Sequence, residues 1–261
     1  MHLIEVTDLR KYYSSGMLKK QYSKAVDGVS FHIDQGTTLG LVGESGCGKT
    51  TLGRLLLRLI EPTSGKICFN GTDITELGRS AMRKLRPQMQ MIFQDPESSL
   101  DPRMRIGESI AEPFRLGLAG KMNQREMDER VLELVDIVGL NGEHVNRYPH
   151  QLSGGQNQRV VLARILAVNP KFIVADEPTA ALDVSVQAQI LRLIMDLKEK
   201  FGLTMLFISH DMEVVRYMSD RIAVMENGRI KSVNAIHSHE VTELSSRSNS
   251  EFPVFRQKRS T

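Results

Sequence analysis

Short apolar runs, separated by turns and charged segments, predict a set of buried strands. Residues 38–42, 172–175 and 205–208 are almost entirely apolar. Continuous apolar runs of this length are typical of parallel strands that are buried on both faces. Further short strands are predicted at residues 3–6, 29–33, 65–69, 89–93 and 221–225, with turns at Asn70-Gly71 and Asn227-Gly228.

Helical patterns lie between these strands. An apolar helix is predicted at residues 52–60, stopped near Pro62, and another at residues 186–200, between two of the buried strands. Alternating strands and helices predict an α/β sheet. From about residue 95 to residue 165 the pattern becomes helical and charged, as in residues 123–138, and predicts a separate helical subdomain.

The same pattern sets the expected domain limits. We expect one domain over residues 1–232, with the helical subdomain at about 95–165, and a short C-terminal tail over residues 233–261. The tail is rich in Ser and basic residues, a composition that favours disorder. Residues 14–24 are polar and basic, and we expect them to form an exposed excursion between two strands.

Composition narrows the class of protein. The chain has 261 residues, 41% of them hydrophobic, which suits a soluble globular domain with a subdomain. Its 34 basic and 31 acidic residues nearly balance, so no nucleic-acid partner is expected. The first residues carry an early acid and no apolar core of signal-peptide length, so no signal peptide is expected. No apolar run approaches the ~18 residues of a spanning helix. Any membrane association is therefore expected through a partner. Cys47 and Cys68 show neither metal-ligand nor disulfide spacing, which favours a reducing cytoplasm.

A glycine-rich loop follows the predicted strand at residues 38–42. Its sequence, GESGCGKT, fits the G-x-x-x-x-G-K-[ST] phosphate loop in the strand-to-helix setting that this motif requires, which outweighs a chance lysine in a glycine-rich turn. Backbone amides and the helix N-terminus would bind phosphate oxygens. Lys49 would reach the β- and γ-phosphates, the Thr50 hydroxyl would hold Mg²⁺, and Thr51 would offer a second hydroxyl. The expected ATP-binding residues are Gly43, Glu44, Ser45, Gly46, Cys47, Gly48, Lys49, Thr50 and Thr51.

Two acidic residues end the apolar strand at residues 172–175. Carboxylates at the carboxyl end of a parallel strand face the ligand crevice of an α/β sheet. Asp176 is therefore expected to bind Mg²⁺, and Glu177 to accept a proton from an attacking water. Such a pair could by itself be a solvated strand end, but the upstream Lys49-Thr50 favours the functional interpretation.

Residues 152–156, Leu-Ser-Gly-Gly-Gln, predict a second anion-binding helix start. Ser153 is a suitable N-cap for a helix predicted at residues 156–167. An ordinary capped helix does not explain two glycines in its first turn. The pentapeptide resembles the signature of the ABC transporter ATPases, and the resemblance extends from about residue 3 to residue 232. The signature residues are Ser153, Gly154, Gly155 and Gln156.

The resemblance implies a fold and a set of site residues. The fold is α/β: a phosphate-loop, RecA-like ATPase core with an N-terminal antiparallel β subdomain and an inserted helical subdomain. Tyr13 matches the aromatic residue that stacks on adenine, although a core tyrosine is the alternative. Gln94 matches the glutamine that meets Mg²⁺ and links to the helical subdomain. His210 matches the histidine that contacts the γ-phosphate.

Two positions depart from the family pattern. Asp183 belongs to the loop that crosses the dimer, but its usual leading serine is Ala180 here, which puts one polar contact across the dimer in doubt. Asn157 stands where Arg or Gln is more usual, and little effect is expected.

The resemblance also implies an assembly and a mechanism. Two subunits, identical or different, would pack head to tail, each ATP lying between one phosphate loop and the partner's signature. Lys49 and Mg²⁺ would neutralise the γ-phosphate, Glu177 would polarise water and His210 would stabilise the developing charge, so the catalytic residues are Glu177, His210 and Lys49. Further partners would be two membrane permeases and an external solute-binding protein, holding the chain at the cytoplasmic face of the cell membrane.

Two segments point to one branch of the family. Residues 94–113 and 183–191 resemble the importers of oligopeptides, dipeptides and nickel. Peptide members usually run longer, with a His-Pro-Tyr-Thr and cysteine extension. The short Phe252-Pro253-Val254 ending is similar to the second ATPase of nickel importers, or else is an unselected end. Nickel or a small metal chelate is therefore the expected cargo, with peptides as runner-up. His237 and His239 are too weak a pair to bind metal.

Three alternatives remain at this stage. An ATPase-like subunit of a soluble phosphonate-degrading complex would resemble this branch. A small-molecule kinase shares the phosphate loop but not the pentapeptide at 152–156, and no acceptor-site signature is visible. A DNA-repair ATPase would need a coiled-coil or zinc insertion, and the sequence has neither.

Overall fold

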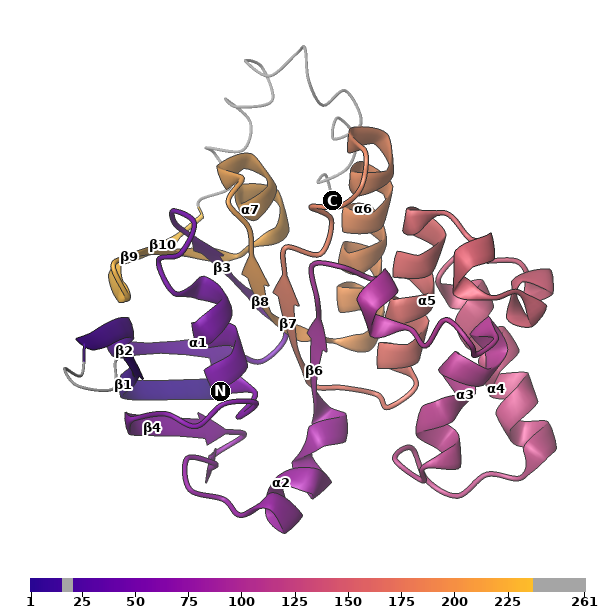
Figure 1. Cartoon of the computed structure of the whole chain (residues 1–261), viewed down its shortest axis with the longest axis horizontal. Coiled ribbons are helices and arrows are strands. Elements are labelled where there is room, and N and C mark those ends of the chain that lie inside the picture. The colour runs from indigo at the N-terminus through magenta and orange to yellow at the C-terminus, as the bar shows by residue number, and fades with distance from the viewer. Residues whose placement is uncertain (16–20, 237–261) are drawn as a thin grey trace.

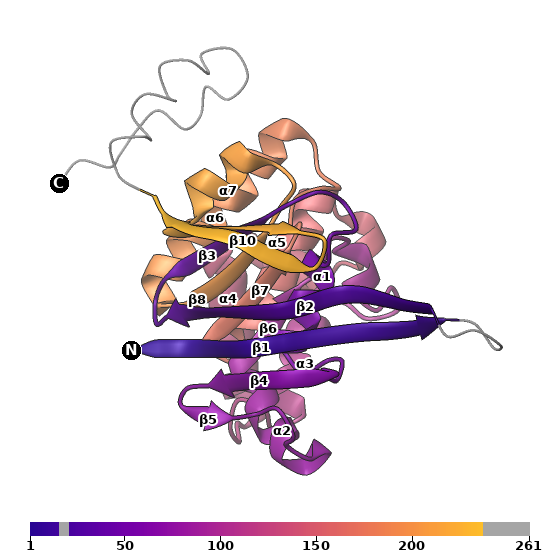
Figure 2. The same ribbon diagram turned by 90° about the vertical axis from the view of Figure 1, so that its left-hand side faces the viewer.

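The chain folds around two β-sheets. A computed structural model describes residues 1–15 and 21–236. The smaller sheet is antiparallel, with strand order β2-β1-β4-β5. Figure 2 shows its long strands side by side. Its strands are β1 (His2–Ser15), β2 (Gln21–Asp34), β4 (Ser64–Phe69) and β5 (Thr72–Asp73).

The larger sheet has the order β10-β9-β3-β8-β7-β6 and is parallel except at β10. β3, β7 and β8 are buried along their whole length, as their apolar sequences predict. Their carboxyl ends lie at one edge, where the phosphate loop and the acidic pair follow. Its strands are β3 (Thr38–Val42), β6 (Met89–Ile92), β7 (Phe172–Asp176), β8 (Thr204–Ile208), β9 (Arg221–Glu226) and β10 (Arg229–Ala235).

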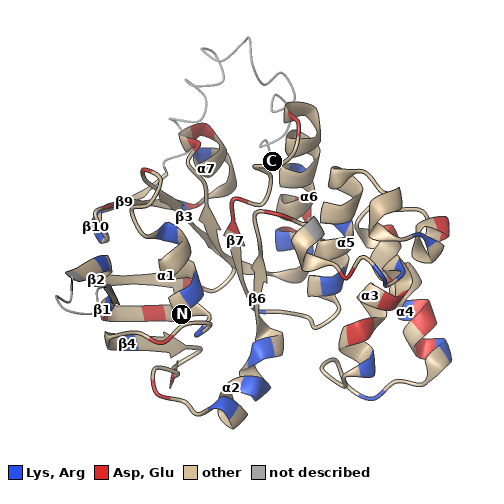
Figure 3. Ribbon diagram, in the orientation of Figure 1, with Lys and Arg blue, Asp and Glu red and all other residues tan. Residues whose placement is uncertain are grey.

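Helices cover the larger sheet and extend beyond it (Figure 1). α3, α4 and α5 lie together beside the sheet, in the segment predicted to be helical. Figure 3 shows acidic and basic residues mixed along α4, as expected for a helix with a solvent-exposed face. The helices are α1 (Lys49–Leu56), α2 (Arg79–Leu85), α3 (Ile106–Arg115), α4 (Gln124–Ile137), α5 (Gly154–Leu166), α6 (Val184–Phe201) and α7 (Met212–Met218). Short 3-10 turns are η1 (Arg86–Gln88), η2 (Glu97–Ser99), η3 (Gly142–Asn146) and η4 (Pro149–Gln151).

The two faces of the larger sheet belong to different hydrophobic cores. Ile173 and Ala175 of β7 join the core that contains α5 and α6, whereas Phe172 and Val174 join the core that contains α1 and the smaller sheet. This alternation follows from the two-residue period of a strand. α1 and α5 therefore lie on opposite faces of the sheet.

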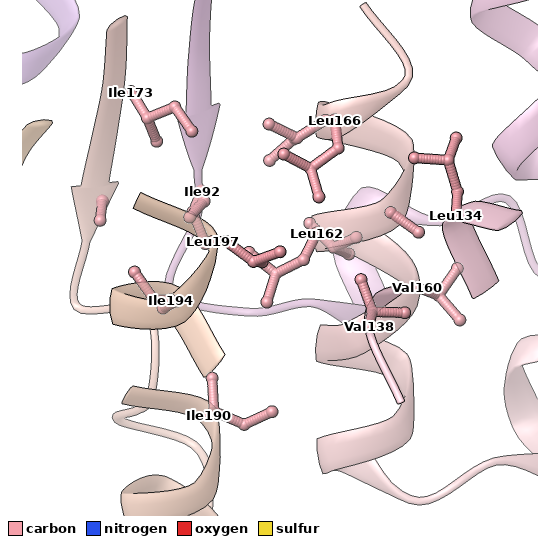
Figure 4. Packing of buried hydrophobic residues seen from close by; sticks show 14 of the residues in the cluster. Ile92, Leu134, Val138, Val160, Leu162, Leu166, Ile173, Ile190, Ile194 and Leu197 are labelled. Atoms are coloured by element: carbon pink, nitrogen blue, oxygen red, sulfur yellow. The ribbon is translucent and has the colours of Figure 1, made fainter. Parts of the chain in front are cut away.

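Helix α5 connects the larger sheet to the helical segment. Leu162 and Leu166 of α5 line the same small space as Ile194 and Leu197 of α6, and Figure 4 shows Leu162 beside Leu197, with Leu134 of α4 on the other side of α5. These side chains belong to one hydrophobic core, so α3 and α4 are packed onto the sheet through α5. The helical segment is thus continuous with the main core.

Several sequence predictions need correction. The segment predicted as an exposed excursion, residues 14–24, is exposed at residues 14 and 22–24, but it consists of paired strands: β1 continues to Ser15 and β2 begins at Gln21, with Ser14 paired to Tyr22. The helix predicted at 52–60 begins at Lys49, inside the phosphate loop, and ends at Leu56 before the positive-φ residue Arg58. Residues 237–261 of the predicted tail, including His237 and His239, lie outside the described residues. Within the described ranges, no helix is both long and apolar enough to cross a bilayer.

Candidate active site

Close packing requires glycine at two of the three glycine positions in the loop between β3 and α1. Gly48 has φ +111°, and a Cβ there would lie 2.1 Å from the carbonyl oxygen of Ala25. A Cβ at Gly43 would lie 2.1 Å from the carbonyl oxygen of Met225. Gly46 has φ +79° but faces open space. The loop is therefore held against neighbouring backbone at two points, while its tip remains free to meet a ligand.

The side chain of Lys49 folds back under this loop. It is buried, and its Nζ donates to the carbonyl oxygens of Gly43 at 2.6 Å and Glu44 at 2.9 Å. Glu44, Ser45 and Gly46 are exposed at the tip. A buried ammonium beside a turn at a helix N-terminus is a setting that stabilises phosphate. The cradle therefore fits the phosphates that the motif predicts.

The acidic pair meets the loop from β7. Thr50 Oγ1 donates to Asp176 Oδ1 at 3.2 Å, so the two residues expected to hold Mg²⁺ are in contact. Burial raises the pKa of Asp176, against the opposing hydrogen bond from Thr50 and the positive charge of Lys49. A buried carboxylate and a hydroxyl form the oxygen donor set that Mg²⁺ prefers. The residues present thus fit this ion.

Glu177 is held in an unusual backbone conformation. Its φ is +48°, a region that costs a non-glycine residue free energy and that is enriched at functional sites. Its amide donates to the carbonyl oxygen of Ile208 at 3.0 Å, which fixes it to the end of β8. Its Oε1 lies 3.3 Å from His210 Nδ1, with 22% of the Glu177 side chain and 68% of the His210 side chain exposed. Both groups are therefore accessible to a ligand.

The remaining predicted residues lie on separate elements. Tyr13 is near the end of β1, exposed, with Lys11 Nζ 5.1 Å from its ring centroid. Gln94 is exposed in the loop after β6. Thr51 lies in the first turn of α1. The structure thus brings Lys49, Thr50, Asp176, Glu177 and His210 to one edge of the larger sheet, with the other three on the segments around them.

A hydrogen-bonded link that the sequence analysis missed supports the phosphate loop. The Gly228 amide donates to the Cys47 carbonyl at 3.0 Å, and the Gly228 carbonyl accepts from the Asp27 amide at 2.8 Å. Asp27 also accepts from the Tyr12 hydroxyl, and from Arg229 at 2.7 and 3.0 Å. These bonds, led by that from Tyr12, lower the pKa of Asp27 to about 2. Tyr12, Asp27 and Arg229 belong to no motif, and Arg229 lies 202 positions from Asp27, so no sequence signal marks this link.

The signature helix has a complete N-terminal cap. The Ser153 side chain accepts from the Gln156 amide at 3.3 Å, while the Gln156 side chain accepts from the Ser153 amide at 2.9 Å. The helix begins at Gly154, two residues before the predicted start. This helix is α5, which lies on the opposite face of the larger sheet from α1.

Packing also explains why two signature positions, 154 and 155, are glycine. A Cβ at Gly155 would lie 2.4 Å from Val186 Cγ1, and one at Gly154 would lie 3.1 Å from Leu182 Cδ2. Asp183 caps the neighbouring helix α6 by accepting from the Val186 amide at 3.0 Å, a bond that lowers its pKa. The expectation that a capped helix leaves these glycines unexplained is therefore wrong for Gly155. Its missing side chain also allows α5 and α6 to approach.

Comparison with known proteins decides the family. Residues 26–180 match the ABC transporter family. This chain belongs to that family. It is 48% identical over 240 residues to the oligopeptide transport ATP-binding protein AppF of Bacillus subtilis (strain 168), covering 90% of this chain and 72% of the relative. It is also 48% identical over 244 residues to the dipeptide transport ATP-binding protein DppF of Lactococcus lactis, covering 92% of this chain and 77% of the relative.

Solved ABC cassettes share the fold. The dimeric, post-hydrolysis ATP-binding cassette MJ0796 bound to ADP and Pi has a TM-score of 0.80 and 30% identity, over 90% of this chain and 99% of that one. CbiO1 of Clostridium perfringens has a TM-score of 0.81 and 26% identity, over 95% of this chain and 96% of that one. The predicted fold class and the ATPase activity of an ABC cassette are thus confirmed.

Proposed function

We propose that this ABC ATPase powers the import of dipeptides or oligopeptides. The observation that carries the proposal is the 48–50% identity to ATP-binding proteins named for oligopeptide and dipeptide transport. The sequence analysis placed nickel or a metal chelate first and peptides second. The relatives reverse that order, since those compared above are named for peptides. They give no support to the soluble phosphonate-degrading complex.

The geometry supports distinct roles for the site residues. Lys49 and the loop amides bind the phosphates. Thr50 and Asp176 would hold Mg²⁺, together with Gln94 from the loop after β6. Bound Mg²⁺ neutralises charge on the phosphate oxygens. Tyr13 offers its exposed ring to adenine.

The Glu177 carboxylate accepts a proton from the attacking water. Its Oε1 lies 3.3 Å from His210 Nδ1, so the two side chains can act at one point. His210 stabilises negative charge that develops on the γ-phosphate. The fixed backbone of Glu177 limits the positions that its carboxylate can take.

The second anion site is completed by another ATPase subunit. Ser153 and the first-turn amides of α5 lie on the opposite face of the sheet from the phosphate loop, so one nucleotide cannot use both within a single chain. A head-to-tail pair brings them together, and Asp183 lies in the loop facing the partner. The dimeric cassette MJ0796 supports this arrangement.

The same assembly includes membrane components. Two permease subunits hold the chain at the cytoplasmic face of the cell membrane, and an external solute-binding protein delivers the peptide. The helical subdomain, at about residues 95–165, contacts the permeases. Gln94 stands where the nucleotide site joins this subdomain, so a change at the γ-phosphate can move it.

Uptake by a deletion strain tests the cargo. Loss of the gene should abolish accumulation of a labelled dipeptide or oligopeptide and confer resistance to toxic peptides, with ⁶³Ni²⁺ uptake unchanged. A plasmid copy should restore uptake, whereas a Glu177→Gln copy should not. Reduced nickel uptake with normal peptide uptake would reverse the assignment. Copurification with lyase subunits in place of permeases would favour the phosphonate-degrading complex.

A further inference from the structure

Two histidines and an aspartate converge on the smaller sheet, away from the phosphate loop. In the described residues, His2, His32 and Asp34 are the group of at least three His, Cys, Asp or Glu side chains whose potential ligand atoms all lie within 4.8 Å of one another. The start of β1 and the end of β2, which hold these residues, run side by side at one edge of the molecule (Figure 2).

Strand geometry explains this meeting. His32 and Asp34 are two residues apart on β2, so both side chains point to the same face of the sheet. The antiparallel register pairs His2 of β1 with Asp34. Because the two histidines are 30 positions apart in sequence, no metal-ligand spacing marks them. The backbone is fixed beside the group, since the Gln35 amide donates to the Met1 carbonyl at 3.1 Å.

The side chains are close enough to share one ion. His2 Nδ1 lies 2.6 Å from Asp34 Oδ1, and His32 Nε2 lies 3.9 Å from Asp34 Oδ2. The two imidazole centroids are 4.0 Å apart. Ligand atoms on a tetrahedral zinc lie about 3.3 Å from one another, since each bond is ~2.0–2.1 Å. Small side-chain rotations would therefore bring all three onto one ion, because each side chain is 39–44% exposed.

We propose that His2, His32 and Asp34 bind one divalent transition-metal ion, of the Zn²⁺ or Ni²⁺ kind, with water completing the coordination. Imidazole nitrogens with one carboxylate form a donor set for such ions, whereas Mg²⁺ and Ca²⁺ require oxygen ligands. The ion joins the first strand to the β2–β3 turn. It lies at the amino end of β3, opposite the end that carries the phosphate loop, so the site is separate from ATP hydrolysis.

The positive charge of one neighbouring side chain, Arg221, disfavours a bound cation. Arg221 Nη1 lies 3.0 Å from His32 Nε2, so its guanidinium must move when that nitrogen binds a cation. Without metal, the group is a surface contact between the His2 ring and the Asp34 carboxylate, with Arg221 against His32. If the group binds a metal ion, Arg221→Gln should increase the metal affinity, because the substitution removes a competing positive charge.

Zn²⁺ titration of the full chain tests the site. The protein should carry no N-terminal extension or oligohistidine tag, and His237→Gln with His239→Gln should serve as the parent to exclude the tail. Calorimetry without nucleotide should show one Zn²⁺ per chain. His32→Gln and Asp34→Asn should each weaken binding by about tenfold or more, while Arg221→Gln should tighten it. His150→Gln, an exposed histidine stacked on Tyr148, is the control and should bind like the parent.

A stability readout gives an independent check. If Zn²⁺ binds only the folded chain, it must raise the melting temperature. This Zn²⁺-dependent rise should disappear in His32→Gln and Asp34→Asn. His2→Gln gives a third variant if either of these fails to fold. Equal Zn²⁺ isotherms for the parent and the folded ligand variants would overturn the proposal, as would loss of binding in Arg221→Gln.

Discussion

At the scale of single residues, Glu177 combines features that ordinary strand ends lack. Its backbone has a positive φ, its amide is bonded to β8, and its carboxylate lies beside His210. A backbone held in a costly conformation persists only where the surrounding structure fixes it. The backbone that carries the carboxylate is therefore fixed by the fold itself.

Glu177→Gln should bind MgATP normally and lose hydrolysis by about 10²-fold or more, because it removes the proposed proton acceptor and leaves the phosphate cradle intact. Phosphate release and binding of a fluorescent ATP analogue measure the two effects separately. Lys49→Ala should instead weaken the binding of ATP. Most of the turnover surviving in Glu177→Gln would mean that another group acts as the base.

Gly48→Ala should damage the phosphate loop more than Gly46→Ala. Both positions have positive φ, which costs an alanine about 1–2 kcal/mol, but only at Gly48 does the new Cβ meet backbone, at 2.1 Å from Ala25 O. Thermal unfolding and ATP affinity of the two variants form a matched pair. Gly48→Ala should lose stability and ATP binding together, and equal effects at the two positions would contradict the packing argument.

At the scale of elements, the Asp27 link ties the smaller sheet to the β9–β10 hairpin and so to the phosphate loop. Asp27 accepts from Tyr12 and Arg229, and its backbone amide reaches Gly228, which in turn contacts Cys47. The pKa of Asp27 is about 2, below the ~3.9 of an unfolded chain. Its charged form is thus favoured by folding.

Asp27→Asn should lower stability at pH 7, and its difference from wild type should shrink as pH falls. A carboxyl whose pKa is depressed contributes stability above its unfolded pKa and loses that contribution between about 4 and about 2. Urea unfolding at pH 7 and pH 3 measures this. Asp8→Asn is the control, since Asp8 forms an exposed ion pair with Arg10 at 2.8 Å. An effect independent of pH would assign the loss to packing.

Leu162→Ala should destabilise the chain by about 2–5 kcal/mol. The Leu162 side chain of α5 is 3% exposed and is packed against α6 and the larger sheet. Leu132→Ala on α4, where the side chain is 49% exposed, should change stability by less than about 0.5 kcal/mol. Denaturant unfolding compares the two. Because the helical segment shares this core, the Leu162 variant should still unfold in one transition.

At the scale of the whole molecule, motifs and buried strands were readable from sequence, but long-range partners were not. The phosphate loop and β7 carry their own local patterns, and the structure brings their residues together as expected. The length of the β1–β2 hairpin was missed because polar residues at 14–24 resemble a loop, whereas cross-strand pairing holds Ser14 beside Tyr22. The Asp27 link and the packing of Gly155 depend on contacts between distant segments.

The chain should associate only when ATP is bound. Glu177→Gln should form dimers with ATP, alone or with a paired ATPase. Ser153→Arg should prevent this, because it places bulk and charge where the partner's γ-phosphate would lie in the proposed dimer. Size-exclusion chromatography with light scattering measures the mass. Val184→Arg in the first turn of α6, at a 56%-exposed position, tests whether the neighbouring Asp183 loop also faces the partner. Dimers of equal stability with and without ATP would contradict a shared site.

The close approach of α5 and α6 also constrains how this protein can diverge. Since a Cβ at Gly155 would lie 2.4 Å from Val186 Cγ1, neither position can drift alone toward a larger residue. Homologues with alanine at the position of Gly155 should carry a smaller residue at that of Val186. In the laboratory, Val186→Ala should rescue part of the damage caused by Gly155→Ala. A signature that is usually read as a nucleotide contact would then leave a trace of coupled substitution in a neighbouring helix.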